Sequence, residues 1–220
     1  MIAVRRSGSD GHLQSMDPLR RALAAPALAA ASFILLVGCA GPAGSGGAQF
    51  GEAYPQPPDG EVVGQGTVMD VAGAAELCMG PIAESYPPQC SGIPLKGWSW
   101  QGIDGSESSD DVRWGTYAVQ GTYDGDALTV TAPPIMLALY DPMPIPDPSG
   151  GEPGEGDEST LLALQEELPE RLGDEYLSSS LDNGYLWVDV VWDDGTLQDA
   201  ADAEFGADSV IVRSALRPLP

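Results

Sequence analysis

The chain has 220 residues, of which 43% are hydrophobic and 19% charged, a composition typical of a globular protein with one or two domains. It carries 33 acidic and 9 basic residues, which gives a formal net charge of −24. So acidic a surface repels phosphate backbones and excludes nucleic acid as a partner.

The first segment with a clear pattern is an export signal. Residues 22–38 form an uncharged apolar stretch directly after two arginines, and a basic region before an apolar one is typical of such signals. The stretch is interrupted by Pro26 and is at the short limit for a helix that spans a bilayer. Because residues 1–15 add nothing that an export signal needs, translation from Met16 is a second interpretation.

The apolar stretch ends in Leu36, Val37, Gly38 and Cys39, and this ending resembles the lipobox of bacterial lipoproteins. The resemblance implies that residues 1–38 are a lipoprotein signal peptide, that Sγ of Cys39 takes a diacylglyceryl group, and that the new N-terminus is acylated. We then expect a protein held by lipid on the extracytoplasmic face of the cell membrane. A signal anchor, or an ordinary secretory signal with an accidental cysteine, is the alternative.

Cleavage before Cys39 changes the chemistry that the chain can support. It removes two acidic residues, four arginines and the only histidine (Asp10, Asp17, Arg5, Arg6, Arg20, Arg21 and His12), which leaves 31 acidic and 5 basic residues. Without an imidazole, Ser-His-Asp and Cys-His catalysis are excluded, as are zinc, copper and haem sites with histidine ligands. We therefore expect a protein that is not an enzyme and uses no cofactor.

Two cysteines, Cys78 and Cys90, follow Cys39. Disulfides persist in exported proteins, so the sequence predicts a bridge between these two residues. The loop that this bridge closes is short, and the expected stabilisation is roughly 3 kcal/mol. Two reduced, buried thiols are the alternative.

Residues 39–60 are rich in Gly, Ala, Ser and Pro and lack apolar periodicity, which predicts a flexible tether. Residues 61–140 are predicted to form a β-rich unit, with strands near 61–71, 76–79, 93–100 and 134–140. So many short strands fit a small closed barrel, and we favour an OB-like β-barrel.

A hairpin is the clearest local signal within the β-rich unit. Asp124 and Gly125 separate two alternating runs, which predicts a two-residue turn with Tyr123 opposite Asp126. This register places the apolar side chains of both runs on one face, as a half-buried hairpin requires.

Residues 141–158 contain five prolines and six acidic residues and are predicted to be an acidic linker or a long surface loop. Residues 159–220 are predicted to form a small α-β-β-α-β unit, so that the fold class is α+β. Its first helix carries five leucines between residues 161 and 172, with Pro169 expected to kink it or to open a second short helix.

The remaining elements of this unit follow from turn and cap residues. Asn183 and Gly184 predict a second hairpin, with Asp182 opposite Tyr185 and Leu177 opposite Val190. A helix should then begin with Thr196 as its N-cap and stop at Gly206, and residues 208–216 should form the last strand.

Two segments carry a further resemblance. Residues 76–100 (ELCMGPIAESYPPQCSGIPLKGWSW) and 187–216 (WVDVVWDDGTLQDAADAEFGADSVIVRSAL) are similar to parts of an uncharacterised family of exported actinobacterial proteins. The resemblance implies export and a shared fold, and it implies no activity.

Acidic and aromatic side chains supply the candidate sites. Four carboxylates in a Gly/Ser-rich loop could bind calcium, although their spacing does not match an EF-hand and a solvated loop is the alternative (Asp104, Glu107, Asp110 and Asp111). Trp98, Trp100 and Trp114 fit the core of the barrel better than a stacking surface. Trp187, on the hairpin face opposite the leucines and near Tyr176, is a candidate binding surface.

Together these features favour a non-catalytic binding or interaction module of the cell envelope. The partner would be an envelope protein or a cell-wall component, reached from the membrane through the N-terminal lipid. A cell-envelope hydrolase that uses two carboxylates needs no histidine and is the rival interpretation. A purely structural envelope protein is the third interpretation.

Overall fold

The computed structural model describes residues 49–220, which lie in one compact unit. The predicted export signal, the lipobox and Cys39 therefore lie outside the described residues. Among the helices of residues 49–220, none combines the length and the apolar character needed to cross a bilayer.

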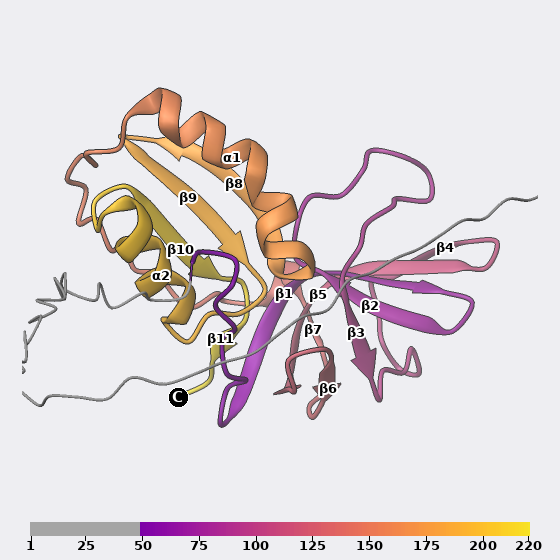
Figure 1. Cartoon of the computed structure of the whole chain (residues 1–220). Coiled ribbons are helices and arrows are strands. Elements are labelled where there is room, and N and C mark those ends of the chain that lie inside the picture. The colour runs from indigo at the N-terminus through magenta and orange to yellow at the C-terminus, as the bar shows by residue number, and fades with distance from the viewer. Residues whose placement is uncertain (1–48) are drawn as a thin grey trace, which may run out of the picture. The chain divides into compact units, whose positions relative to one another are not determined.

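The described part of the chain is a mixed α+β structure, as the sequence predicts (Figure 1). In chain order its elements are β1 (Glu61–Val71), β2 (Ala74–Cys78), β3 (Ile93–Lys96), β4 (Glu107–Ser109), β5 (Val112–Tyr123), β6 (Leu128–Val130), β7 (Ile135–Met136), the 3-10 helix η1 (Leu137–Leu139), α1 (Glu158–Leu172), the 3-10 helix η2 (Gly173–Glu175), β8 (Tyr176–Asp182), β9 (Tyr185–Val190), α2 (Thr196–Phe205), β10 (Val210–Ser214) and β11 (Arg217–Pro218).

Five of the strands close into a β-barrel. Its order is β1-β2-β3-β6-β5, and β5 pairs back onto β1. The pairings are antiparallel except that between β3 and β6, which is parallel. The barrel encloses a core of aliphatic and aromatic side chains, among them Val62, Val68, Leu77, Val119 and Leu128.

Strand β1, predicted at 61–71 and found there, supports the barrel along its whole length. One edge pairs with β5, whereas the other edge pairs first with β11 and then with β2. Gly64 and Gly66 lie where the second edge changes partner. A Cβ atom on Gly66 would stand 2.1 Å from the carbonyl oxygen of Cys78, so glycine permits the close approach of β2.

The hairpin between β5 and β6 exists, but its predicted register is wrong. Tyr123 pairs with Leu128, so the turn has four residues instead of two. The Asp124 carboxylate accepts hydrogen bonds from the backbone N–H groups of Asp126 and Ala127, at 3.1 and 2.8 Å, and stabilises the wider turn. The register differs by two residues, so each side chain keeps its predicted face.

Other strands of the barrel are shorter than predicted or were not predicted. The expected strand at 93–100 ends at Lys96, and the expected strand at 134–140 is reduced to β7 followed by η1. Strand β4, which pairs with the start of β5, lies in a segment that the sequence assigns to a loop.

A second, three-stranded sheet has the order β10-β9-β8, with β9 antiparallel to β8 and parallel to β10. Helices α1 and α2 lie on the same face of this sheet (Figure 1). Leu161, Leu164 and Leu168 of α1 pack there against Leu186 and Val188 of β9.

The hairpin between β8 and β9 has the predicted turn, in which Asn183 and Gly184 adopt φ angles of 49° and 80°. Its predicted pairing fails at one position only. A β-bulge lies between Tyr176 and Ser178, so Tyr176 replaces Leu177 opposite Val190. Leu177 packs against the barrel core instead.

The predicted N-cap of α2 is also wrong. Gly195, with a φ of 104°, occupies the N-cap, and the Thr196 side chain caps nothing. The carboxylate of Asp193 accepts hydrogen bonds from the backbone N–H groups of Leu197 and Gln198, at 2.8 and 3.3 Å. Gly206 ends the helix as predicted.

Residues before and between the two sheets pack against them. Phe50, assigned to the tether by its composition, is only 2% exposed and belongs to the core under α1 and α2. The carbonyl oxygen of Gln56 accepts a hydrogen bond from Trp192 Nε1 at 2.8 Å. In the acidic segment before α1, the backbone N–H of Gly154 donates to Asn183 O at 2.8 Å.

The two sheets are joined by the segments that leave them. Val191 and Trp192 follow β9, and Leu216 follows β10, yet all three pack in the barrel core. The chain then forms β11 and pairs with β1. All buried residues of the described cores lie between residues 50 and 216, so a chain that starts at Ala43 keeps every core contact.

Candidate functional site

A groove of about 610 Å³ opens on the barrel. We call it the aromatic groove and define it by six of its lining residues: Trp98, Asp104, Tyr117, Ile135, Met136 and Leu139. Its size falls within the range of ligand sites, about 300–1,000 Å³.

The course of the chain explains why the groove is there. Strands β3 and β6 are parallel neighbours and end side by side, after which their chains diverge. Residues 97–99 and 101–104 line one side. Residues 130–136 and 139 return across β5 and line the other. Met136 pairs with Tyr117, which fixes the returning segment against the barrel.

Glycine permits the two sides of the groove to approach. Gly105 has a φ of 77°, and a Cβ atom there would lie 2.2 Å from Met136 Sδ. The positive φ favours glycine at residue 105, and a side chain there would displace the thioether of Met136.

Three aromatic rings pack together beside the groove, and two of them, those of Trp98 and Tyr117, line it. The ring centroids of Trp98 and Trp100 are 5.0 Å apart, edge to face, and Tyr117 lies 5.7 Å from Trp98. The Tyr117 hydroxyl donates to Asp104 O at 2.8 Å, and burial raises the pKa of this hydroxyl. Trp98 therefore has two roles, because it packs against the core and also lines the groove.

The indole nitrogen of Trp98 is the exception in this cluster. Trp100 Nε1 donates to Asp70 Oδ2 at 2.8 Å, whereas the buried Nε1 of Trp98 has no acceptor. A buried indole N–H usually finds an acceptor, so Trp98 retains an unused donor beside the groove. Trp114, in contrast, is buried against Tyr86 with ring centroids 5.5 Å apart.

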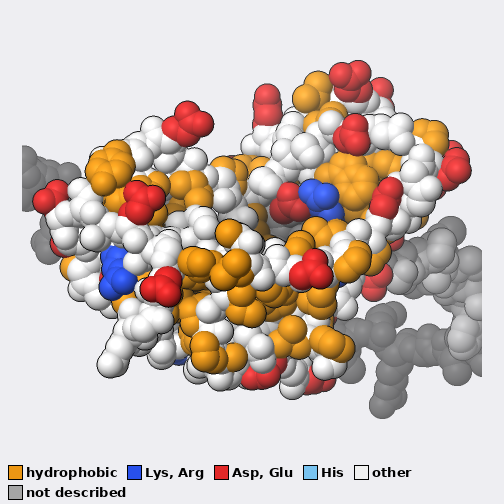
Figure 2. Space-filling model, turned by 180° about the vertical axis from the view of Figure 1, so that it is seen from behind, with side chains coloured by type: hydrophobic (Ala, Val, Ile, Leu, Met, Phe, Trp, Pro, Cys, Tyr) orange, Lys and Arg blue, Asp and Glu red, His pale blue; other side chains and the backbone are white. Residues whose placement is uncertain are grey.

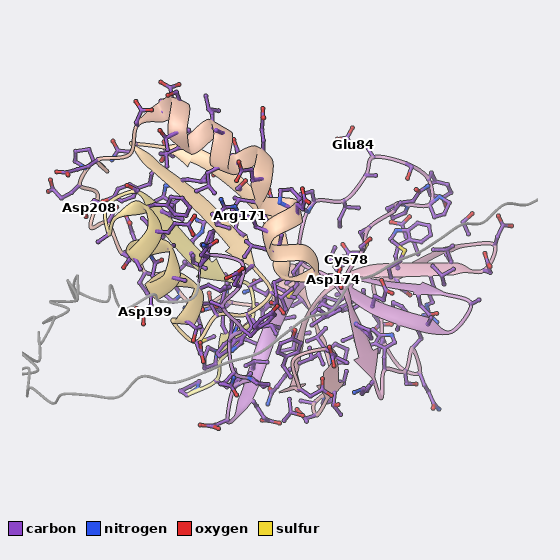
Figure 3. All side chains as sticks on the ribbon, viewed as in Figure 1. Cys78, Glu84, Arg171, Asp174, Asp199 and Asp208 are labelled. Carbon is purple, nitrogen blue, oxygen red and sulfur yellow. A yellow bond between two sulfur atoms is a disulfide. The ribbon has the colours of Figure 1, made fainter. Side chains whose placement is uncertain are left out.

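A second cavity, of about 520 Å³, lies between the barrel and the chain that follows α1. We call it the junction cavity; its lining includes Met79, Tyr123, Asp126, Asp174, Glu175 and Leu177. Asp174 lies just beyond the end of α1, close to the barrel end of β2 that carries Cys78 (Figure 3).

Glu175 is the most perturbed carboxyl group of the junction cavity. Burial raises its pKa, the Trp192 backbone N–H and the Tyr123 hydroxyl oppose that rise, and the negative charges of Asp174 and Asp126 add to it. Its Oε2 is buried without a hydrogen-bond partner. The Tyr123 hydroxyl donates to Gly125 O at 2.7 Å, and burial raises its pKa too.

The structure does not bring Trp187 and Tyr176 together. Tyr176 packs against the core on the helix-covered face of the second sheet, whereas Trp187 lies on the opposite face. The Arg213 guanidinium lies 5.0 Å from the Trp187 ring centroid and forms an ion pair with Asp189 at 2.8 Å. Trp187 is half-buried beside this pair.

The carboxylates considered for calcium do not form a ligand set. Within residues 49–220, no three His, Cys, Asp or Glu side chains gather as metal ligands would, and this includes Asp104, Glu107, Asp110 and Asp111. Asp110 lies in the tight turn between β4 and β5, with a φ of 52°.

The predicted disulfide is confirmed. Cys78 and Cys90 are bonded, with their Cα atoms 6.1 Å apart. Cys78 is buried beside Met69 and Trp114, so the bridge ties the loop after β2 to the barrel.

Each basic residue of the described chain is engaged by a neighbour. Lys96 pairs with Asp124 at 2.7 Å, and Arg171 pairs with Glu167 and Glu204 at 2.9 and 2.8 Å. Arg113 donates to Ser106 Oγ, Arg213 pairs with Asp189, and Arg217 reaches Pro144 O. Figure 2 shows acidic side chains spread over the face that it views, with few basic ones among them.

Comparison with family models, with curated proteins and with solved structures gives no match for this chain. The aromatic groove and the junction cavity therefore have to be interpreted from their own chemistry. The sequence identifies Trp98 as an aromatic of the barrel, but nothing in it marks Met136 or Glu175 as a neighbour of such a site.

Proposed function

We propose that this protein is a lipid-anchored, extracytoplasmic binding module of the cell envelope that recognises a cationic protein without catalysing a reaction. The observation that carries the proposal is the distribution of charge. From residue 49 onward the chain has 31 acidic and 5 basic residues, and all five basic side chains already have partners within the fold. The uncompensated carboxylates attract a basic surface.

Features of the sequence and of the barrel support this proposal. The ending at Cys39 supplies the anchor, and the chain after it has no histidine for nucleophilic or metal catalysis. The closed five-stranded barrel, with β3 parallel to β6, favours an OB-like architecture. Such barrels serve as binding scaffolds, although the fold alone assigns no ligand.

The junction cavity supports one rival function. A carboxylate-based hydrolase could use Glu175, whose pKa is raised by burial, as the acid, with Asp126 or Asp174 as the second carboxylate. If the soluble chain cleaves a cell-wall glycan or peptide and Glu175→Gln abolishes turnover, the hydrolase replaces the binding module. A purely structural envelope protein predicts no ligand under any condition.

The anchor is tested with the Cys39→Ala variant of the full chain. Loss of the lipid should leave an uncleaved precursor or a protein that no longer partitions into detergent. The measurement compares the migration and the fractionation of the variant with those of the unaltered chain. Identical behaviour of the two proteins contradicts the lipoprotein proposal.

The partner is tested with the soluble chain Ala43–Pro220 immobilised on a surface. Basic envelope proteins should bind at low salt, with an affinity that falls as salt is raised, because the Debye length shrinks from about 30 Å at 0.01 M to about 8 Å at physiological ionic strength. Retention that does not depend on salt, or retention of acidic proteins, contradicts the proposal.

A further inference from the structure

The aromatic groove carries apolar side chains that cover nothing within the described chain. Leu139 on η1 is 73% exposed, and Ile135 on β7 is 46% exposed. Both line the same concave surface as the half-buried Trp98 and Met136. Apolar side chains gathered at a concave site are typical of a contact surface.

The charge at the groove favours a cationic occupant. Asp104 is the one charged side chain in its lining. Arg113, the base beside the aromatic stack, is held by Ser106 Oγ at 2.8 Å and lies 4.5 Å from the Trp100 ring centroid. An anionic occupant therefore meets an uncompensated carboxylate, whereas a cationic one is attracted.

The backbone at the groove also has unused hydrogen-bonding groups. Strand β7 pairs with β5 alone among the strands of residues 49–220, so its outer edge has no strand partner. An extended peptide supplies N–H and C=O groups to such a strand edge.

We propose that the aromatic groove binds an extended segment of the cationic partner, with an apolar side chain between Trp98 and Leu139 and a flanking lysine or arginine at Asp104. This site rests on the proposed function, because the sign of the partner's charge comes from it. The apolar side chain supplies affinity, whereas the basic residue supplies steering and orientation.

The probe is a short peptide, Lys-Leu-Val-Leu-Lys, acetylated and amidated at its ends and titrated into the soluble chain by calorimetry. Two matched peptides separate charge from apolar contact: one has glutamates in place of both lysines, and the other has serines in place of both leucines. We expect the first peptide to bind more tightly than either control. The indole proton of Trp98 should shift in the NMR spectrum only with the peptide that binds.

Two pairs of variants locate the site. Leu139→Ser should weaken binding about fivefold, because the leucine loses most of its burial against the peptide, whereas Leu162→Ser, at a 48% exposed leucine of α1, should not. Asp104→Asn should weaken binding about threefold and reduce its salt dependence, whereas Asp199→Asn on α2 (Figure 3) should not. Unchanged melting temperatures show that each variant is folded.

The outcomes separate this site from the function on which it rests. If the lysine peptide binds in a salt-sensitive way but Leu139→Ser and Asp104→Asn do not change its affinity, the groove is not the binding site. The proposal of a cationic partner is then still supported. If the glutamate peptide binds as tightly as the lysine peptide, both the groove as the binding site and the cationic partner are contradicted. If none of the peptides binds, the groove is not a peptide site and the proposal is wrong.

Discussion

Glu175 is half-buried at the junction cavity, its Oε2 is buried without a hydrogen-bond partner, and burial raises its pKa. A carboxyl group whose pKa is higher in the folded chain than in the unfolded one does not penalise folding below its unfolded pKa. It destabilises the fold progressively as pH rises through the folded value. The penalty is therefore small near pH 4 and larger at neutral pH.

The first prediction follows from this direction of the change in stability with pH. Glu175→Gln should raise the melting temperature at pH 7 to 8, and the gain should disappear toward pH 4, because the amide never ionises. The measurement is thermal unfolding of both proteins across this pH range. Glu166→Gln, at an exposed position of α1, is the control and should show no such pH-dependent gain. A gain that grows toward low pH contradicts the argument.

Asp193 stabilises the start of α2 from two residues before its N-cap. Because its carboxylate accepts from two backbone N–H groups, Asp193→Ala should cost about 1–2 kcal/mol of unfolding free energy. Thr196→Ala should cost less, since the Thr196 side chain makes no cap. Urea denaturation of the two variants compares them directly, and a larger loss for Thr196→Ala would restore the cap predicted from sequence.

At the scale of elements, the close approach of β1 and β2 depends on the absence of a side chain at Gly66. Gly66→Ala places a methyl group against the backbone of β2 and should cost roughly 1–3 kcal/mol, the usual range for overpacking. Gly60→Ala is the matched control, because a Cβ atom there meets nothing within 4 Å. Equal stabilities of the two variants, measured by chemical denaturation, would mean that β1 does not need this close approach.

The hairpins show what local residue patterns decide. In the second hairpin Asn183 and Gly184 adopt the left-handed angles that such a turn requires, and the predicted pairing holds up to the bulge. In the first hairpin the Asp124 side chain stabilises a longer turn. The sequence Asp-Gly fits both turn lengths, so the pattern alone could not choose between them.

At the scale of the whole molecule, the two sheets share core residues and a strand pairing. Trp192 packs in the barrel core, and β11 pairs with β1 after the chain has left the second sheet. We therefore expect one cooperative unfolding transition for residues 43–220. Far-ultraviolet circular dichroism, which reports both sheets, and tryptophan fluorescence should give the same midpoint.

Reduction of the Cys78–Cys90 bond tests the same cooperativity. The bridge closes a short loop and should contribute roughly 3 kcal/mol, so reduction should lower the single midpoint seen by both probes. If reduction splits the transition, so that one part has a lower midpoint and the other keeps its midpoint, the barrel and the second sheet unfold separately.

The sequence by itself determined the features that depend on residue type and local spacing. The extent of β1 follows from its valines, the bridge follows from the two cysteines left after Cys39, and the strongly negative charge follows from composition. These features need no knowledge of distant neighbours, because periodicity, turn residues and residue counts report them directly.

Only the tertiary structure decided where the sites lie. Met136 reaches Tyr117 through a strand of two residues, too short to give a periodic pattern. Glu175 becomes partly buried because a segment after α1 meets the barrel. Phe50, in a stretch with the composition of a tether, packs under helices that begin more than 100 residues later. Burial and hydrogen-bond partners depend on contacts between distant segments, and a local pattern of residues does not contain them.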